Sequence, residues 1–264
     1  MGEARAPFLR LRQVCLVASD LEAEAARIAS IFGLEACYRD PNVAKYGLEN
    51  VLFPIGTRFL EIVSLTRAGT AAGRFLERHG GRHGYMVILD CNDPERYRRR
   101  AESLGVRVAN LIRHDAYFGV QLHPKDTGGA MLEFNSTVGG EDPEGPYGPA
   151  GSDWKRAIRR DRTLAMTSVE IEAPDPASIA QRWAQIMERK AEDSGNGRRR
   201  IALDAGAIEF VPARVPEPVF SAVTLQAADA RALLAEAETR GCAESDATVS
   251  ACGMRFRITP ARGS

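Results

Sequence analysis

The stretch that decides the fold is residues 119–135, GVQLHPKDTGGAMLEFN. Two apolar runs flank a turn at residues 126–129, DTGG, where glycine supplies the positive φ that hairpin turns need. After the turn, apolar and polar residues alternate, and a period of two is typical of a strand with two different faces. The alternation places Glu133 on the face opposite Leu132 and Phe134. A carboxylate in an otherwise apolar strand is either solvated or directed into a pocket.

The composition indicates a soluble globular protein that is long enough for two domains. The chain has 264 residues and a formal net charge of zero, which argues against a general nucleic-acid or membrane-surface role. Its five cysteines show no CxxC spacing and fit reduced thiols better than a disulfide framework. The first residues lack an apolar signal core, and no apolar run is long enough to span a bilayer. We therefore expect a cytoplasmic protein with neither nucleic acid nor membrane as a partner.

One unit of strand, helix and hairpin occurs about four times along the chain. Each helix is predicted to begin at an aspartate, because an aspartate side chain accepts a hydrogen bond from the first turn of a helix. A unit this short cannot bury its own sheet face, whereas two side by side can, and a ligand would sit in the cup between them. The four helix-opening residues are Asp20, Asp93, Asp175 and Asp229.

A segment rich in glycine and proline divides the four units into two pairs. Residues 136–153, STVGGEDPEGPYGPAGSD, have the composition of a linker, and residues 154–161 are predicted to form a short basic helix. The expected organisation is a first domain over residues 1–137, a linker with its short helix over 138–162, and a second domain over 163–264.

Several segments match a known superfamily. QVCLVASDL, FLEIVSL, GYMVILDCND and HPKDTGGAMLEF do so in the first half, and TSVEIEAPDP, AIEFVPA and FSAVTLQAADA do so more weakly in the second. The chain resembles the vicinal oxygen chelate superfamily, which includes glyoxalase I, bleomycin-resistance proteins, methylmalonyl-CoA epimerase and extradiol dioxygenases. The resemblance implies an α+β fold of two domains. Each would consist of paired βαβββ modules that form a curled, cup-like mixed sheet with helices on its outer face.

The resemblance also implies positions for a divalent metal such as Zn, Mn, Fe or Mg. Enzymes of the superfamily usually hold the metal with one side chain from each of four strands. Both carboxylates of the usual set are kept here, but the two usual histidines are replaced by Gln13 and Met86. A glutamine carbonyl can ligate, whereas a thioether is a poor match for the hard cations that carboxylates prefer. His83 joins the set if a bulge changes the register. The four matching positions are Gln13, Glu61, Met86 and Glu133.

The corresponding four positions in the second half offer fewer possible metal ligands. Its positions are Ser168, Glu209, Ala222 and Phe256, of which only Glu209 is a metal ligand. Since one ligand does not make a site, the second domain is expected to be degenerate and to serve as a structural partner or lid.

Candidate residues for chemistry and binding gather in the first half. Glu61 and Glu133 would form paired carboxylates in a dry cup, and such a pair raises one pKa and makes a general base or a metal site. The alternative is that both reach solvent or pair with Lys or Arg. His123 shares a face with Gln121 by a count of two and would bind substrate or carry a proton, although a lone histidine at a strand end is more often a surface or capping residue. The remaining candidate substrate-binding residues are Cys15, Tyr85 and Met86.

Two functions remain open from the sequence. By resemblance, the first is an enzyme that acts on a small oxygen-rich metabolite as an isomerase, lyase or dioxygenase, with Glu61 and Glu133 in a metal-dependent site. The alternative is a metal-free drug-binding or metabolite-binding protein of the bleomycin-resistance type. In both cases the partner is a small-molecule ligand, and the protein is a monomer or a homodimer.

Overall fold

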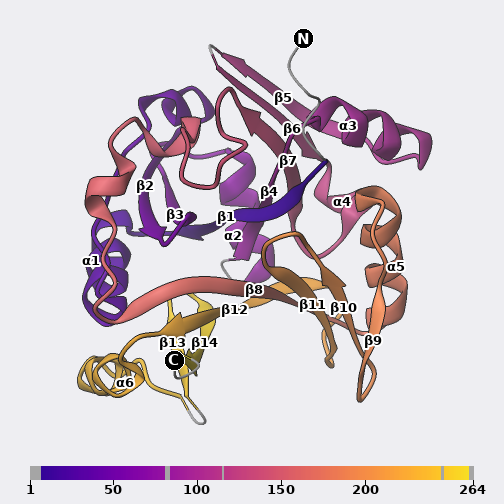
Figure 1. Cartoon of the computed structure of the whole chain (residues 1–264). Coiled ribbons are helices and arrows are strands. Elements are labelled where there is room, and N and C mark those ends of the chain that lie inside the picture. The colour runs from indigo at the N-terminus through magenta and orange to yellow at the C-terminus, as the bar shows by residue number, and fades with distance from the viewer. Residues whose placement is uncertain (1–6, 81–83, 115, 245–246, 262–264) are drawn as a thin grey trace.

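The computed structural model describes residues 7–80, 84–114, 116–244 and 247–261, which form two seven-stranded mixed sheets with helices against them (Figure 1). The predicted α+β fold of two domains is confirmed. Within the described residues, no helix is both long enough and apolar enough to cross a membrane.

The first sheet is built around two central antiparallel strands, β1 and β4. Strand β3 pairs in parallel with β1, and β7 pairs in parallel with β4, so the strand order is β2-β3-β1-β4-β7-β6-β5. The strands are β1 (Leu9–Ala18), β2 (Leu48–Ile55), β3 (Arg58–Leu65), β4 (Gly84–Cys91), β5 (Val108–His114), β6 (Tyr117–Leu122) and β7 (Met131–Thr137).

The second sheet repeats this plan around β8 and β12, in the order β13-β14-β12-β8-β11-β10-β9. Again the two central strands are antiparallel and each has a parallel neighbour. The strands are β8 (Thr163–Ala173), β9 (Glu192–Gly195), β10 (Arg198–Ala202), β11 (Ala207–Pro212), β12 (Val219–Ala227), β13 (Thr248–Ala251) and β14 (Met254–Pro260).

The helices begin where the sequence predicts. Each of the four expected aspartates accepts a hydrogen bond from the backbone N–H three residues on, at 2.9 or 3.0 Å, and so caps a helix. The α-helices are α1 (Leu21–Phe32), α2 (Ala71–His79), α3 (Pro94–Ser103), α4 (Pro124–Thr127), α5 (Pro176–Met187) and α6 (Ala230–Thr239). The 3₁₀ helices are η1 (Pro41–Tyr46), η2 (Gly148–Ala150) and η3 (Trp154–Ala157).

One apolar core joins the two sheets. Helix α1 packs against α6 and α3 packs against α5, so each helix pair bridges the halves of the chain. The Phe32 and Phe256 rings lie 4.7 Å apart between centroids, and Trp183 donates from Nε1 to the Thr127 carbonyl at 2.9 Å. Because this core takes one face of each sheet, the opposite face of the first sheet is left for a site.

One local prediction was wrong, and one helix was missed. Strands β6 and β7 do pair antiparallel, but the short helix α4 followed by Gly128 and Gly129 joins them, rather than a tight turn at 126–129. Proline at residue 124 favours the first turn of a helix, and His123 caps it. Helix α2 was not predicted, although Thr70 is a regular N-cap for it and accepts from the Gly73 N–H at 3.0 Å.

Candidate functional site

A cavity of about 430 Å³ lies on the face of the first sheet that points away from the shared core. Alternation along the strands produces it, since Val14 and Leu16 of β1 enter the core while Gln13 and Cys15 line the cavity. All four positions matched by the resemblance line this one cavity, namely Gln13, Glu61, Met86 and Glu133.

The strand register explains how these side chains meet. Cys15 lies opposite Glu61 of β3 and Met86 of β4, which forms one row across the sheet. Gln13 lies opposite Ile88, and Ile88 opposite Glu133 of β7, which forms the next row. Rows two residues apart share a face, so two carboxylates far apart in sequence open into the same space.

Glu61 is buried among neutral hydrogen-bond donors. Its side chain is held by Asn50 Nδ2 at 2.6 Å and by Gln13 Nε2 at 2.8 Å, and the residue is 8% exposed. Burial raises the pKa of Glu61, donors from Asn50, Cys15 and Gln13 offset part of the rise, and the negative charge of Glu133 adds to it.

Glu133 has a similar environment with one stronger donor. The Tyr117 hydroxyl donates to Oε1 at 2.5 Å, Gln121 Nε2 donates to Oε2 at 2.7 Å, and Asn135 Nδ2 lies 3.2 Å from Oε1. The residue is 2% exposed, and burial raises its pKa against these hydrogen bonds. The alternatives for these glutamates were exposure to solvent or pairing with Lys or Arg. Both residues are buried, and among the described residues neither forms an ion pair with Lys or Arg.

The Tyr147 side chain connects the hydrogen-bonded groups around Glu61 with those around Glu133. The Tyr147 hydroxyl donates to Gln13 Oε1 at 2.9 Å and accepts from Asn135 Nδ2 at 3.4 Å. A continuous set of hydrogen bonds thus runs from Glu61 through Gln13, Tyr147 and Asn135 to Glu133. Tyr147 belongs to the segment 138–162, which therefore does more than connect the sheets.

Three residues predicted to bind substrate also line the cavity, namely Cys15, Tyr85 and Met86. The Cys15 thiol is fully buried, and burial together with Glu61 raises its pKa well above the usual range, which favours the thiol form. Burial raises the pKa of Tyr85 to about 12. The apolar part of the wall comes chiefly from Val63, Met86, Ile88, Ile112 and Met131.

Polar residues of η1 and β5 also line the cavity. Tyr46, which is 40% exposed, accepts from Asn110 Nδ2 at 3.1 Å. Asn110 Nδ2 also lies 3.2 Å from Gln121 Oε1, and Gln121 in turn donates to Glu133. Hydrogen bonds through Asn110 and Gln121 therefore connect the half-exposed Tyr46 to Glu133.

The structure does not bring His123 to the cavity. His123 accepts from the Lys125 N–H at 3.2 Å as the cap of α4 and is not among the lining residues. Strand β6 ends at Leu122, so the alternation that places Gln121 in the cavity stops before His123. His83 lies outside the described residues.

The donor set around the cavity does not fit a resident divalent metal. Gln13 turns its N–H toward Glu61 and its carbonyl toward Tyr147, and both oxygens of each glutamate already meet neutral donors. Among the described residues, no three His, Cys, Asp or Glu side chains are placed to hold a metal ion together. The remaining matched position, Met86, offers only a soft thioether. We therefore derive no step through a metal.

The corresponding face of the second sheet is filled by ion pairs. Glu170, whose side chain is 4% exposed, meets Arg257 at 2.7 Å and Arg198 at 3.2 Å, and Glu209 pairs with Arg200. Phe256, one of the four positions matched in this half, lies opposite Val223, and both enter the core. Its neighbours Arg255 and Arg257 take the open face instead.

The sequence of this chain matches the model of a known protein family. A family model described as "Glyoxalase-like domain" matches residues 14–187. No match was found among curated proteins.

Similar solved structures cover nearly the whole chain. A hypothetical protein from Staphylococcus aureus has a TM-score of 0.69 and 13% identity, over 96% of this chain and 100% of that one. The Mn(II)-bound glyoxalase from Novosphingobium aromaticivorans has a TM-score of 0.67 and 14% identity, over 97% and 83%. A mutant of 4-hydroxymandelate synthase from Streptomyces coelicolor has a TM-score of 0.66 and 14% identity, over 90% and 76%. At these identities the likeness extends to the fold alone.

The sequence did not single out several residues of the polar network. Asn135 and Gln121 had a usable signal, since Asn135 lies two residues after Glu133 and Gln121 lies opposite it in the register. Tyr147 had none, because it lies in an aperiodic segment.

Proposed function

We propose that this chain, which belongs to the glyoxalase-like domain family of the vicinal oxygen chelate superfamily, is an enzyme. It would move a proton on a small oxygen-bearing metabolite. The substrate would bind in the cavity of the first sheet, with Glu61 and Glu133 as the acid–base pair and no metal in the step. The reaction class is isomerisation or a lyase-type reaction next to a carbonyl group.

One observation supports this proposal above the others. Two buried carboxyl groups line one cavity, and burial raises the pKa of both without a cation to offset it. Carboxyl groups with raised pKa values can hold or accept a proton near neutral pH, which is what general acid–base catalysis needs. A pair of structural carboxylates would more commonly be joined to Arg or Lys, as Glu170 and Glu209 are in the second sheet.

The hydrogen bonds and charges around each glutamate suggest which one is the base and which one is the acid. The phenol of Tyr117 favours the ionised form of Glu133, whereas the charge of Glu133 disfavours ionisation of Glu61. Glu133 would then be the base that takes a proton from the carbon beside the carbonyl. Glu61 would be the acid that gives its proton to the carbonyl oxygen as the electron pair moves there. When the deprotonated carbon carries a hydroxyl group, Glu133 then returns the proton to the former carbonyl carbon while Glu61 takes the proton of that hydroxyl. The hydroxyl becomes the new carbonyl group, and both glutamates regain their starting protonation, which completes an isomerisation.

The cavity wall supports the same chemistry. Apolar side chains form much of its lining, and a volume of about 430 Å³ suits a small metabolite. Gln13 and Asn50 hold Glu61 in place from two sides, which leaves little reorganisation for the transfer itself.

Deuterium incorporation tests the proposal without a known substrate. Pools of hydroxy-ketones, hydroxy-aldehydes and keto-acids are incubated with the protein in D₂O, and NMR detects exchange of carbon-bound hydrogen beside the carbonyl. The unaltered protein should label at least one compound, E133Q should lose at least about a hundredfold in rate, and E61Q a similar factor. E209Q, on the corresponding face of the second sheet, is the matched control and should label at the unaltered rate. Equal labelling by E133Q and E209Q would contradict the assignment.

A second function keeps some support. Both oxygens of each glutamate already have hydrogen-bond partners, and much of the wall is apolar, which also suits a metal-free binding protein for a drug or metabolite. Tight binding of a compound that shows neither turnover nor deuterium incorporation would favour this reading.

A further inference from the structure

The side-chain amide of Gln13 lies between Tyr147 and Glu61 and is hydrogen-bonded to both. A glutamine amide has a donor end and an acceptor end of nearly equal shape, so its neighbours decide the orientation. The Tyr147 hydroxyl donates to Gln13 Oε1 at 2.9 Å, and the opposite end, Nε2, donates to Glu61 at 2.8 Å. The reversed amide would bring a carbonyl oxygen against the carboxyl group of Glu61.

Arg12 lies against the ring of Tyr147. The guanidinium carbon of Arg12 is 4.7 Å from the Tyr147 ring centroid and 5.3 Å from that of Phe59. Tyr147 in turn stacks on Phe59 with the ring centroids 4.8 Å apart. Arg12 and Tyr147 are each 2% exposed, so this cation–aromatic contact is desolvated and correspondingly strong.

A bulge in β1 allows consecutive residues to reach the same tyrosine. In a regular strand, Arg12 and Gln13 would point to opposite faces. The pairing of β1 with β4 shifts its register between Leu11 and Gln13, and this extra residue turns both side chains toward Tyr147.

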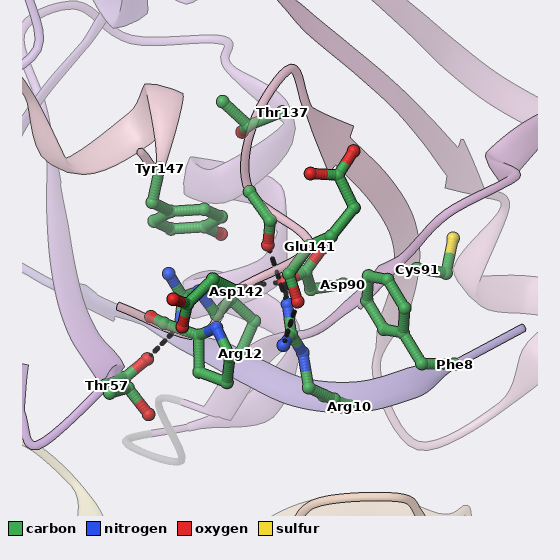
Figure 2. Close-up of polar contacts among 12 residues, drawn as sticks. Phe8, Arg10, Arg12, Thr57, Asp90, Cys91, Thr137, Glu141, Asp142 and Tyr147 are labelled. Atoms are coloured by element: carbon green, nitrogen blue, oxygen red, sulfur yellow. Dashed lines mark hydrogen bonds and ion pairs between the residues drawn. The ribbon is translucent and has the colours of Figure 1, made fainter. Parts of the chain in front are cut away.

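Arg10 and Arg12 of β1 also donate hydrogen bonds to the backbone of the segment that precedes Tyr147 (Figure 2). Arg12 Nη1 donates to the Pro143 carbonyl at 2.8 Å, and Arg10 donates to the carbonyls of Gly140 and Glu141 at 2.8 and 2.9 Å. Asp90 pairs with Arg10 and lies 3.8 Å from Arg12 Nε. The segment before Tyr147 is thus held by charged donors on the strand that carries Gln13.

We propose that Tyr147 is a positioning residue of the cavity, which fixes the Gln13 amide toward Glu61, and that Arg12 is the positioning residue that fixes Tyr147. The segment 138–162 thereby completes the site of the first sheet. The inference rests on the proposed function only in taking this cavity as the place of the chemistry.

The test is hydrogen exchange of the Gln13 side-chain amide, followed by ¹H–¹⁵N NMR on the full chain. The Q13L variant identifies the two amide signals by their disappearance. In Y147F, which keeps the ring and removes the donor, the Gln13 signals should shift and exchange at least about tenfold faster. The matched control is Y97F, which removes the hydroxyl of another buried tyrosine, one that stacks on Phe134 on the core side of the sheet. It should leave the Gln13 signals unchanged.

The role of Arg12 is tested by R12M alone and combined with Y147F. If Arg12 acts through Tyr147, R12M should speed Gln13 exchange, and the double variant should exchange no faster than Y147F. Should R12M fail to fold, Y147F still decides the role of Tyr147, and R12K, which keeps the charge, decides that of Arg12 by the same exchange rate. Unchanged Gln13 exchange in Y147F overturns the proposal.

This outcome is separate from that of the proposed function. Amide exchange needs no substrate, so a changed exchange rate together with no deuterium incorporation would leave the positioning role standing and remove the enzymatic one. With a labelled compound in hand, Y147F should lower kcat by roughly tenfold with little change in KM, because Tyr147 orients a group that acts on the transferring proton.

Discussion

Glu61 of β3 and Glu133 of β7 line one cavity from opposite sides of the central strand pair β1 and β4. Both carboxyl groups are buried, and Gln13, Tyr147 and Asn135 connect them by hydrogen bonds. This relationship between the two glutamates leads to the following expectations.

The pH dependence of stability should report the two glutamates. Burial raises the pKa of each above its usual value of 4.5, so the folded state binds these protons more tightly than the unfolded state. Their contribution to stability is then present below the unfolded pKa and lost as the pH rises through the folded pKa. Urea unfolding from about pH 4.5 upward should show the unaltered protein losing stability relative to the E61Q/E133Q double variant. Parallel stability curves for the two proteins would count against raised pKa values.

Divalent metals should not bind specifically at the cavity, because its carboxylates are occupied by neutral donors. Protein purified without chelator should contain far less than one equivalent of metal. Addition of Mn, Zn, Fe or Mg should raise the Tm of the unaltered protein no more than that of E61Q/E133Q. A stoichiometric metal that both substitutions remove would restore the metal-dependent mechanism.

Loss of the Tyr117 hydroxyl should weaken Glu133 as a base at neutral pH. The hydrogen bond from Tyr117 lowers the pKa of Glu133, so Y117F should raise that pKa further. Because a base must be deprotonated, the rising limb of the pH–rate profile for deuterium incorporation should move to higher pH. An unmoved profile in Y117F, with Y97F as the reference, would mean that Glu133 is not the base.

Removal of the central carboxylate of the second sheet should affect stability but not the site. E170Q leaves Arg198 and Arg257 without their anion. The expected loss in free energy of unfolding is roughly 1–2 kcal/mol, since both arginines are about 40% exposed and water screens them. Chemical denaturation measures this loss, and the rate of deuterium incorporation should remain that of the unaltered protein. A large loss of that rate in folded E170Q would show that the second sheet takes part in the chemistry.

Local sequence rules predicted much of the fold and the residues at the centre of the site. Aspartate caps and strand alternation act over a few residues, which is why Asp20 and its three counterparts, and the facing of Glu133, could be predicted. The family resemblance supplied Gln13 and Met86, each seven residues before a helix-opening aspartate, and Glu61, in the strand after the first hairpin.

The rest depends on contacts that no local pattern encodes. Tyr147 reaches Gln13 from an aperiodic segment, and only the packing of Arg12 and Phe59 around its ring makes that possible. The bulge in β1 reverses the facing of Gln13 relative to its neighbour, which a strict count of two does not anticipate. His123 illustrates the opposite error, since the count continued past the end of β6 at Leu122.

The protonation of the buried pair can be measured directly by infrared spectroscopy near neutral pH. We expect a carbonyl stretch from a protonated, buried carboxyl group in the unaltered protein. That band should disappear in E61Q and persist in E209Q. A spectrum with carboxylate bands alone, and no protonated carboxyl at neutral pH, would contradict the account at its centre.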